Sequence, residues 1–154
     1  MKIGEAEREF LVAEALALAD QLGQEGSLAY REIARTATEG EIPDEWEERV
    51  GELLALSVET GRVRAVHGPA GVRALLALWK DTPQGKKVAE ELDELNLALS
   101  ALRGLPLEAF RVAAIGPGNH LVTVAAGDYE LRLSIDRNGV RLRSLNVGGG
   151  GIGE

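Results

Sequence analysis

The spacing of apolar residues changes once along this chain, near residue 105, and that change limits the folds open to it. Before this point apolar residues recur every three to four positions, which is the period of an α-helix. After it they recur at every second position, which is the period of a half-buried β-strand. The sequence therefore predicts an α+β fold, with a helical region over residues 1–104 and a β-region over residues 105–147.

About five helices are expected in the helical region. The segment from Glu5 to Leu22 carries an apolar arc too wide for a surface helix, so we expect this helix to be central. Glu14 alone interrupts its apolar run from Phe10 to Ala19. Glycine, proline and capping residues place the remaining helices at Ser27–Gly40, Pro43–Gly61, Gly68–Lys80 and Gln84–Arg103. The alternation over Arg62–Val66 predicts a short strand between two of them.

The last expected helix carries an apolar seam with the spacing of a coiled coil. Its members follow one another at steps of four and three, and they are Val88, Leu92, Leu95, Leu99 and Leu102. Two heptads are too few to be stable alone, so this helix must pack on the core or on a copy of itself. The seam is therefore a candidate surface for self-association, with a homodimer as the expected product.

A four-stranded antiparallel β-meander is expected after residue 105. Its strands are predicted at Phe110–Ile115, Leu121–Ala126, Tyr129–Asp136 and from Val140 onward, with Asn138-Gly139 as the hairpin turn. The apolar positions change parity after Ser144, which suggests a β-bulge or a strand end covered on its other face. Such a sheet needs one covered face, and the helix Gln84–Arg103 is the expected cover.

The length of 154 residues suits one hydrophobic core, so we predict a single domain over residues 1–147. The glycine-rich segment 148–154 is expected to be a tail that docks on the body or on a neighbouring subunit. It resembles a phosphate-binding loop only superficially, because no helix follows it to present backbone N–H groups to a phosphate.

Composition excludes several classes of protein. The chain has no cysteine, which excludes disulfides, thiolate metal ligands and cysteine nucleophiles. It has no apolar run of the ~18–20 residues that span a bilayer, and its start lacks the layout of a signal peptide. We therefore expect a cytoplasmic protein that does not associate with membranes. Thirteen arginines against four lysines, with few amides, also resemble the composition of thermophile proteins.

Charge is unevenly distributed along this acidic protein. Residues 105–154 hold five basic and five acidic side chains, so the whole net charge of −8 belongs to residues 1–104. Acidic residues form a run from Glu39 to Glu48, whereas the stretch from Arg62 to Lys80 contains basic residues and no acid. This separation could steer a protein partner toward the chain.

The most site-like group of residues lies in the basic stretch and consists of Arg62, Arg64, His67, Gly68 and Arg73. The glycine precedes an expected helix whose free N–H groups favour an anion, and the guanidinium groups would strengthen that preference. The group predicts an anion-binding or partner-binding site. The simplest alternative is that these arginines neutralise the acidic run at 39–48.

No catalytic arrangement, metal site or cofactor motif is recognisable, because His67 and His120 lie in different kinds of segment without metal-ligand spacing. We therefore expect a non-catalytic protein-interaction or regulatory module that self-associates. One alternative is a small-anion or nucleotide sensor that uses residues 62–73. The other is a winged-helix-like DNA-binding protein, although nucleic acid is a poor partner for a chain whose third helix is acidic.

Overall fold

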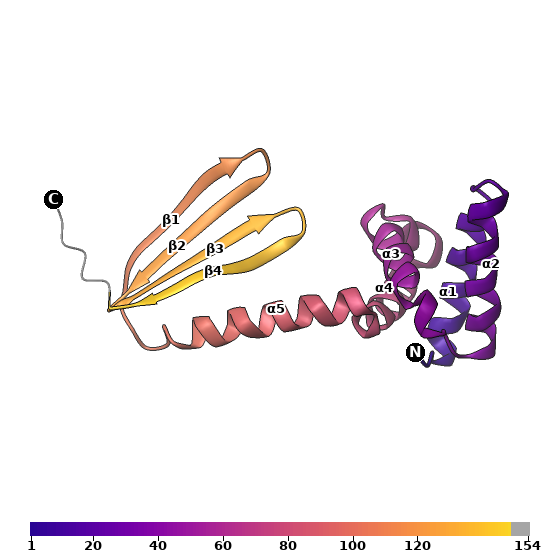
Figure 1. The fold of residues 1–154 in the computed structure, drawn as a ribbon, viewed down its shortest axis with the longest axis horizontal. Coiled ribbons are helices and arrows are strands. Elements are labelled where there is room, and N and C mark those ends of the chain that lie inside the picture. Colours follow the sequence, from indigo (N-terminus) through magenta and orange to yellow (C-terminus); the bar gives the residue numbers. More distant parts are fainter. Residues whose placement is uncertain (149–154) are drawn as a thin grey trace. The chain divides into compact units, whose positions relative to one another are not determined.

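The computed structural model describes residues 1–148 and shows five helices followed by four strands (Figure 1). The helices are α1 (Glu5–Ala19), α2 (Gln24–Glu39), α3 (Asp44–Glu59), α4 (Arg62–Asp81) and α5 (Pro83–Ser100). The strands are β1 (Leu107–Gly116), β2 (Asn119–Ala126), β3 (Tyr129–Asp136) and β4 (Gly139–Val147). This order confirms the predicted α+β class. Residues 149–154 of the predicted tail lie outside the described residues.

The chain divides into two compact units, Met1–Lys87 and Val88–Glu154, with the boundary inside α5. In the first unit α1 contacts α2, α3 and α4, which confirms that this helix is central. The core around it consists mainly of Leu11, Ala15, Ile33, Ile42, Val50, Leu54, Val63 and Leu75. The prediction of one domain over residues 1–147 stays a prediction.

The prediction of a short strand over Arg62–Val66 is wrong, because these residues form the first turns of α4. An alternation over five residues is too short to separate a strand from a helix that buries a single side chain. Val63 is fully buried in the helical core, whereas Val66 is more than half exposed. The winged-helix order predicted above loses the strand on which it depended.

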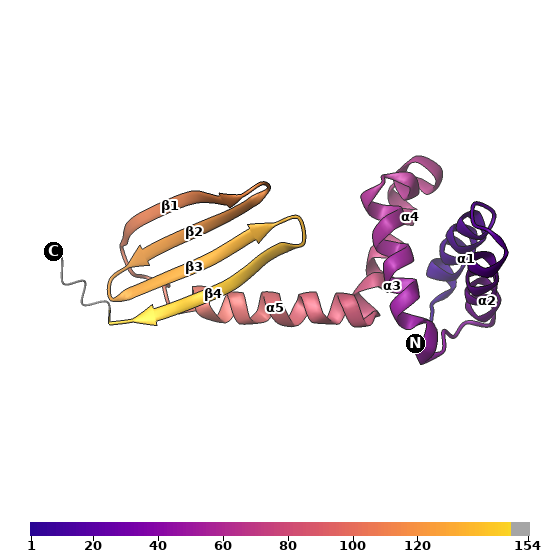
Figure 2. The same ribbon diagram turned by 45° about the horizontal axis from the view of Figure 1, so that its top comes forward.

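The second unit contains an antiparallel sheet in the order β1-β2-β3-β4, which is the predicted meander. Leu131, Leu133 and Val122 lie on one face of this sheet and form a core with Leu95 and Ala98 of α5. Helix α5 is therefore the cover that the sequence predicted. In Figures 1 and 2 strand β4 lies nearest to this helix and β1 lies farthest from it.

The β3–β4 hairpin differs from the predicted one. Gly139 already pairs with Asp136, so the two turn residues are Arg137 and Asn138 rather than Asn138 and Gly139. A type I′ turn needs a positive φ at both central residues, and no non-glycine residue in the described chain has one. Asp136 instead accepts a hydrogen bond from the backbone N–H of Asn138 at 2.7 Å, which stabilises a different turn.

The β-bulge predicted from the parity change is confirmed. Leu133 pairs with Leu142 and Arg132 pairs with Ser144, so Arg143 is the extra residue of β4. The insertion returns Leu145, which pairs with Leu131, to the face covered by α5. Within residues 1–148, no helix combines the length and the apolar character needed to cross a membrane.

Candidate functional site

One carboxylate is enclosed in the helical unit. Glu14 of α1 is only 1% exposed, although it is an acidic residue in a helix whose neighbouring positions are apolar. An ionised carboxylate removed from water is costly unless it is paired and hydrogen-bonded. Glu14 therefore needs charged or hydrogen-bonding partners within the helical unit.

Two side chains from the start of α4 supply the partners of Glu14. Arg62 Nε lies 3.1 Å from Glu14 Oε2, and His67 Nε2 lies 2.9 Å from Glu14 Oε1. The Arg62 side chain remains 40% exposed, so one partner of the buried carboxylate is in contact with solvent. The imidazole also packs edge-on against the Phe10 ring, with the ring centres 5.2 Å apart. Glu14, Arg62 and His67, here called the Glu14 cluster, thus connect α1 to α4.

Two glycines allow the histidine to reach this position. Gly68 interrupts α4 with φ 65° and ψ −164°, a region of backbone conformation that is essentially restricted to glycine. Pro69 then resumes the helix, as its fixed φ favours. Because of this break His67 lies so close to Gly71 that a Cβ at position 71 would collide with the Cβ of His67. The Gly68-Pro69 sequence therefore sets the approach of His67 to Glu14.

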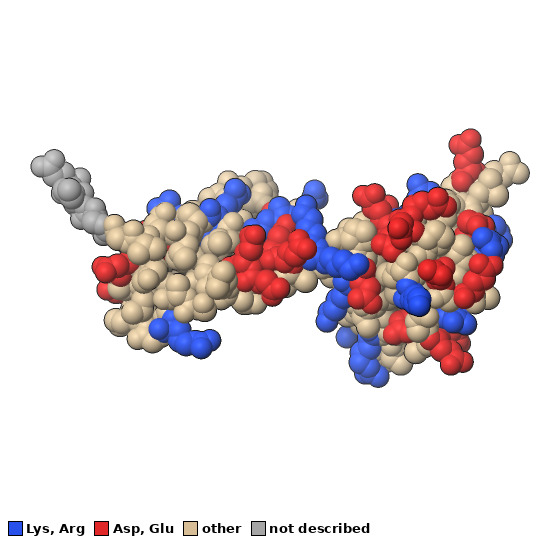
Figure 3. All heavy atoms as spheres, turned by 60° about the horizontal axis from the view of Figure 1, so that its bottom comes forward, with Lys and Arg blue, Asp and Glu red and all other residues tan. Residues whose placement is uncertain are grey.

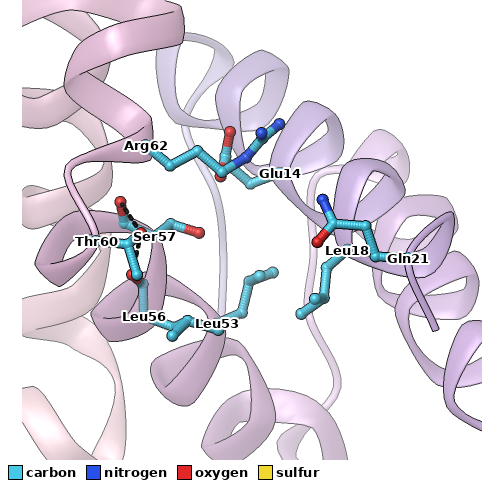
Figure 4. Close-up of a pocket in the computed structure, with 8 residues that line it drawn as sticks. All are labelled: Glu14, Leu18, Gln21, Leu53, Leu56, Ser57, Thr60 and Arg62. Carbon is cyan, nitrogen blue, oxygen red and sulfur yellow. Dashed lines mark hydrogen bonds and ion pairs between the residues drawn. The ribbon is translucent and has the colours of Figure 1, made fainter.

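A cavity of about 150 Å³ lies beside the Glu14 cluster (Figure 4). It is lined by residues of α1, of the loop after α1, of α3 and its C-terminal end, and of the start of α4, namely Glu14, Leu18, Gln21, Leu53, Leu56, Ser57, Thr60 and Arg62. Figure 4 shows the Gln21 amide turned toward the wall formed by Leu53 and Ser57. The cavity therefore combines an apolar wall with several hydrogen-bonding groups.

The structure brings together only part of the basic group predicted from the sequence. Arg62 and His67 meet at Glu14, whereas Arg64 and Arg73 are exposed and form no ion pair with the described residues. The acid that contacts Arg62 is thus Glu14 and not a member of the acidic run at 39–48. Anion or partner binding by Arg62, Arg64, His67, Gly68 and Arg73 stays a prediction.

In the sequence Glu14 stands out only as the single interruption of an apolar run, and the expected site residues do not include it. The available signal was a single acid inside the wide apolar arc of a central helix. Such a position must be buried, and a buried carboxylate needs partners. Its partners could not be identified from the pattern, because Arg62 and His67 lie 48 and 53 residues away.

The second unit presents a different feature, which is an apolar surface along β1. One row of paired residues crosses the sheet from Val112 to Val122 and then to Leu133. Their exposed fractions are 59%, 6% and 9%, so cover by α5 does not extend to β1. Phe110, Leu107 and Ile115 of the same strand are also more than half exposed. Figure 3 shows tan, uncharged surface over the left part of this unit, with acidic and basic side chains gathered beside it and at its margins.

The two edges of the sheet differ in their protection against pairing with another chain. Strand β4 carries Arg141, Arg143 and the bulge, which are features that discourage edge pairing. Arg141 also forms an ion pair with Glu91 of α5, at 3.3 Å. Strand β1 pairs regularly with β2 over residues 109–114 and has only Arg111 as a charged residue there. Register irregularities interrupt β1 on both sides of this stretch, so the less protected part of its edge is residues 109–114.

The sheet covers only some residues of the predicted self-association seam on α5. Leu95 is buried against the sheet and Leu102 partly so, whereas Leu92 and Leu99 are exposed. Val88 is half-buried. The side chains of α5 that contact the sheet therefore follow the spacing of Leu95, Ala98 and Leu102 rather than the whole seam. Self-association through Val88, Leu92, Leu95, Leu99 and Leu102 stays a prediction.

Among residues 1–148, no group of three or more histidine, aspartate or glutamate side chains is arranged to hold a metal ion. His67 belongs to the first unit and His120 to the second. Comparison of the chain with models of protein families, with curated proteins and with solved structures gives no match.

The Glu14 cluster gives a testable stability effect. Replacing Glu14 by glutamine and Arg62 by glutamine, singly and together, should reveal a coupling energy of about 0.5–3 kcal/mol in urea unfolding, because the buried carboxylate depends on its partners. The matched control is the same cycle on Glu32 and Arg35, a hydrogen-bonded ion pair on the exposed side of α2. That surface pair should show weaker coupling. Equal coupling in the two cycles would contradict a structural role for the buried pair.

Proposed function

We propose that this chain is a non-catalytic interaction module that self-associates through the exposed edge strand β1. The observation that supports the proposal most is the row of paired residues Val112, Val122 and Leu133. Leu133 of β3 and Val122 of β2 are buried, whereas Val112 of β1 is exposed to solvent. A long, apolar and unpaired edge strand is a template for pairing with another strand. A second copy offers the same edge, and most homo-oligomers are two-fold symmetric dimers.

The regular part of β1 favours one register for such a dimer. When the two-fold axis passes through the Val112 position, Val112 of one subunit lies opposite Val112 of the partner subunit. Phe110 then lies opposite the partner's Ala114. Arg111 then lies opposite the partner's Ala113. Centring the pair on Arg111 would instead place two like charges directly opposite each other, which is destabilising. The register centred on Val112 therefore combines apolar pairs with separated charges.

Pairing would extend the sheet and place the exposed apolar side chains of both β1 strands next to each other. The backbone N–H and C=O groups on the free edge of β1 would gain partners over residues 110–114. The charges on β4 would remain at the outer edges of the extended sheet, where they discourage further addition of strands. The proposal therefore predicts a closed dimer rather than a growing polymer.

Sedimentation tests the proposal, with the chain expected to be a dimer at micromolar concentration. Replacing Val112 by lysine should raise the dimer dissociation constant by at least about tenfold, because it places two lysines next to each other at the symmetry axis. Val112 is already exposed, so the folded monomer should tolerate the change. The control is Leu28→Lys, which adds the same charge at an exposed leucine of α2. A clean monomer for the unmodified chain would refute the proposal.

A single engineered cysteine tests the register. The chain has no cysteine, so any disulfide must come from the new residue. Directly opposite residues of antiparallel strands have Cα atoms ~4.5–5.5 Å apart, within the range of a disulfide. Val112→Cys should therefore give a covalent dimer under mild oxidation, whereas Leu28→Cys at the same concentration should not. Equal cross-linking of the two variants would show that random collision, and not edge pairing, forms the bond.

A further inference from the structure

The cavity beside the Glu14 cluster is lined by polar groups as well as by leucines. The Ser57 side chain lines it and is only 4% exposed. Gln21 is exposed, so its amide lies at the rim of the cavity and is open to solvent. Each oxygen of Glu14 accepts one hydrogen bond, although a carboxylate oxygen can accept two. Glu14 comes from α1, Ser57 from α3 and Gln21 from the loop after α1, and all three line one space.

The charges around the cavity disfavour an ionic occupant. An anion would be repelled by the Glu14 carboxylate, which already holds Arg62 and His67. A cation would meet the Arg62 guanidinium, which lines the same cavity. A charged guest would also lose its hydration in a partly enclosed space. An uncharged guest with N–H or O–H donors avoids these costs and supplies what Glu14 and Ser57 can accept.

The size and the walls of the cavity define the rest of the guest. A volume of about 150 Å³ matches cavities known to hold a benzene-sized molecule. Buried Leu53, partly buried Leu18 and half-exposed Leu56 form an apolar wall that water solvates poorly. Water alone would satisfy the polar groups but not this wall. A short branched aliphatic body with a polar head satisfies both.

We propose that this cavity is a binding site for a small uncharged molecule that carries an amide or hydroxyl head on a short aliphatic body. The head would bind Glu14, Ser57 and Gln21, and the body would pack on the leucine wall. The inference is independent of the proposed self-association, because every residue that supports it lies in Met1–Lys87.

The proposal can be tested by titrating the full chain with three molecules of nearly equal shape and monitoring each titration by two-dimensional ¹H–¹⁵N NMR. Isobutyramide is neutral, isobutyrate is an anion and isobutylamine is a cation at neutral pH. Isobutyramide should give saturable shifts at the cavity residues and bind at least about tenfold more tightly than either charged molecule. Equal or tighter binding of a charged molecule would overturn the inference. Failure of all three to saturate would also overturn it and indicate a cavity that holds only water.

Variants then locate the site. Ser57→Val fills part of the cavity and removes the hydroxyl, so it should weaken isobutyramide binding at least about tenfold. The control is Thr38→Val, which removes a hydroxyl bonded to the Ala34 carbonyl outside the cavity and should leave binding unchanged. If Ser57→Val does not fold, Gln21→Leu at the exposed rim provides the same test. Unchanged binding in the folded cavity variant would contradict the assignment.

Discussion

A single helix is too narrow to cover a four-stranded sheet, and the organisation of the second unit depends on that mismatch. An α-helix with its side chains is ~10–12 Å wide, whereas strands are spaced ~4.8 Å apart and four of them span considerably more. Helix α5 buries Leu131 and Leu133 of β3 and Val122 of β2, and its cover ends before β1. The apolar face therefore continues past the helix to a free edge. Monomeric globular proteins rarely leave a large contiguous apolar patch exposed.

The first unit buries an acidic side chain and supplies it with hydrogen-bonding partners. Glu14 lies on the central helix and is stabilised by Arg62 and His67 from α4. A buried ion pair often adds little net stability compared with apolar packing of the same volume. Its consequence here is geometric, because it holds α4 beside α1 and leaves polar groups around a small cavity. Gly68 and Gly71 provide the backbone shape that this arrangement needs.

The fold could be predicted to a large extent because its signals are local. The alternation over Leu131 and Leu133 predicts the strand. The parity change after Ser144 predicts a bulge or a strand end covered on its other face, and the structure has a bulge at Arg143. Local patterns failed where two structures satisfy the same spacing. The short alternation over Arg62–Val66 suits a helix as well as a strand. At Asn138, the carboxylate of Asp136 stabilises a turn other than the one that the Asn-Gly pair favours.

The candidate sites were less predictable because they depend on contacts distant in sequence. The basic residues of α4 indicated a site, but the residue that organises them is Glu14 on another helix. The α5 seam indicated an apolar surface, but its spacing did not show which leucines the sheet would bury. The exposure of Phe110 and Val112 follows from the width of the cover, which no local pattern encodes.

The claim that β1 is the associating edge can be tested most directly by amide hydrogen exchange measured at a series of protein concentrations. The account predicts that the amides of residues 110–114 that face the free edge become protected as concentration rises through the dimer dissociation constant, while protection of α1 and α3 stays constant. Exchange in β1 that does not change with concentration would contradict the account.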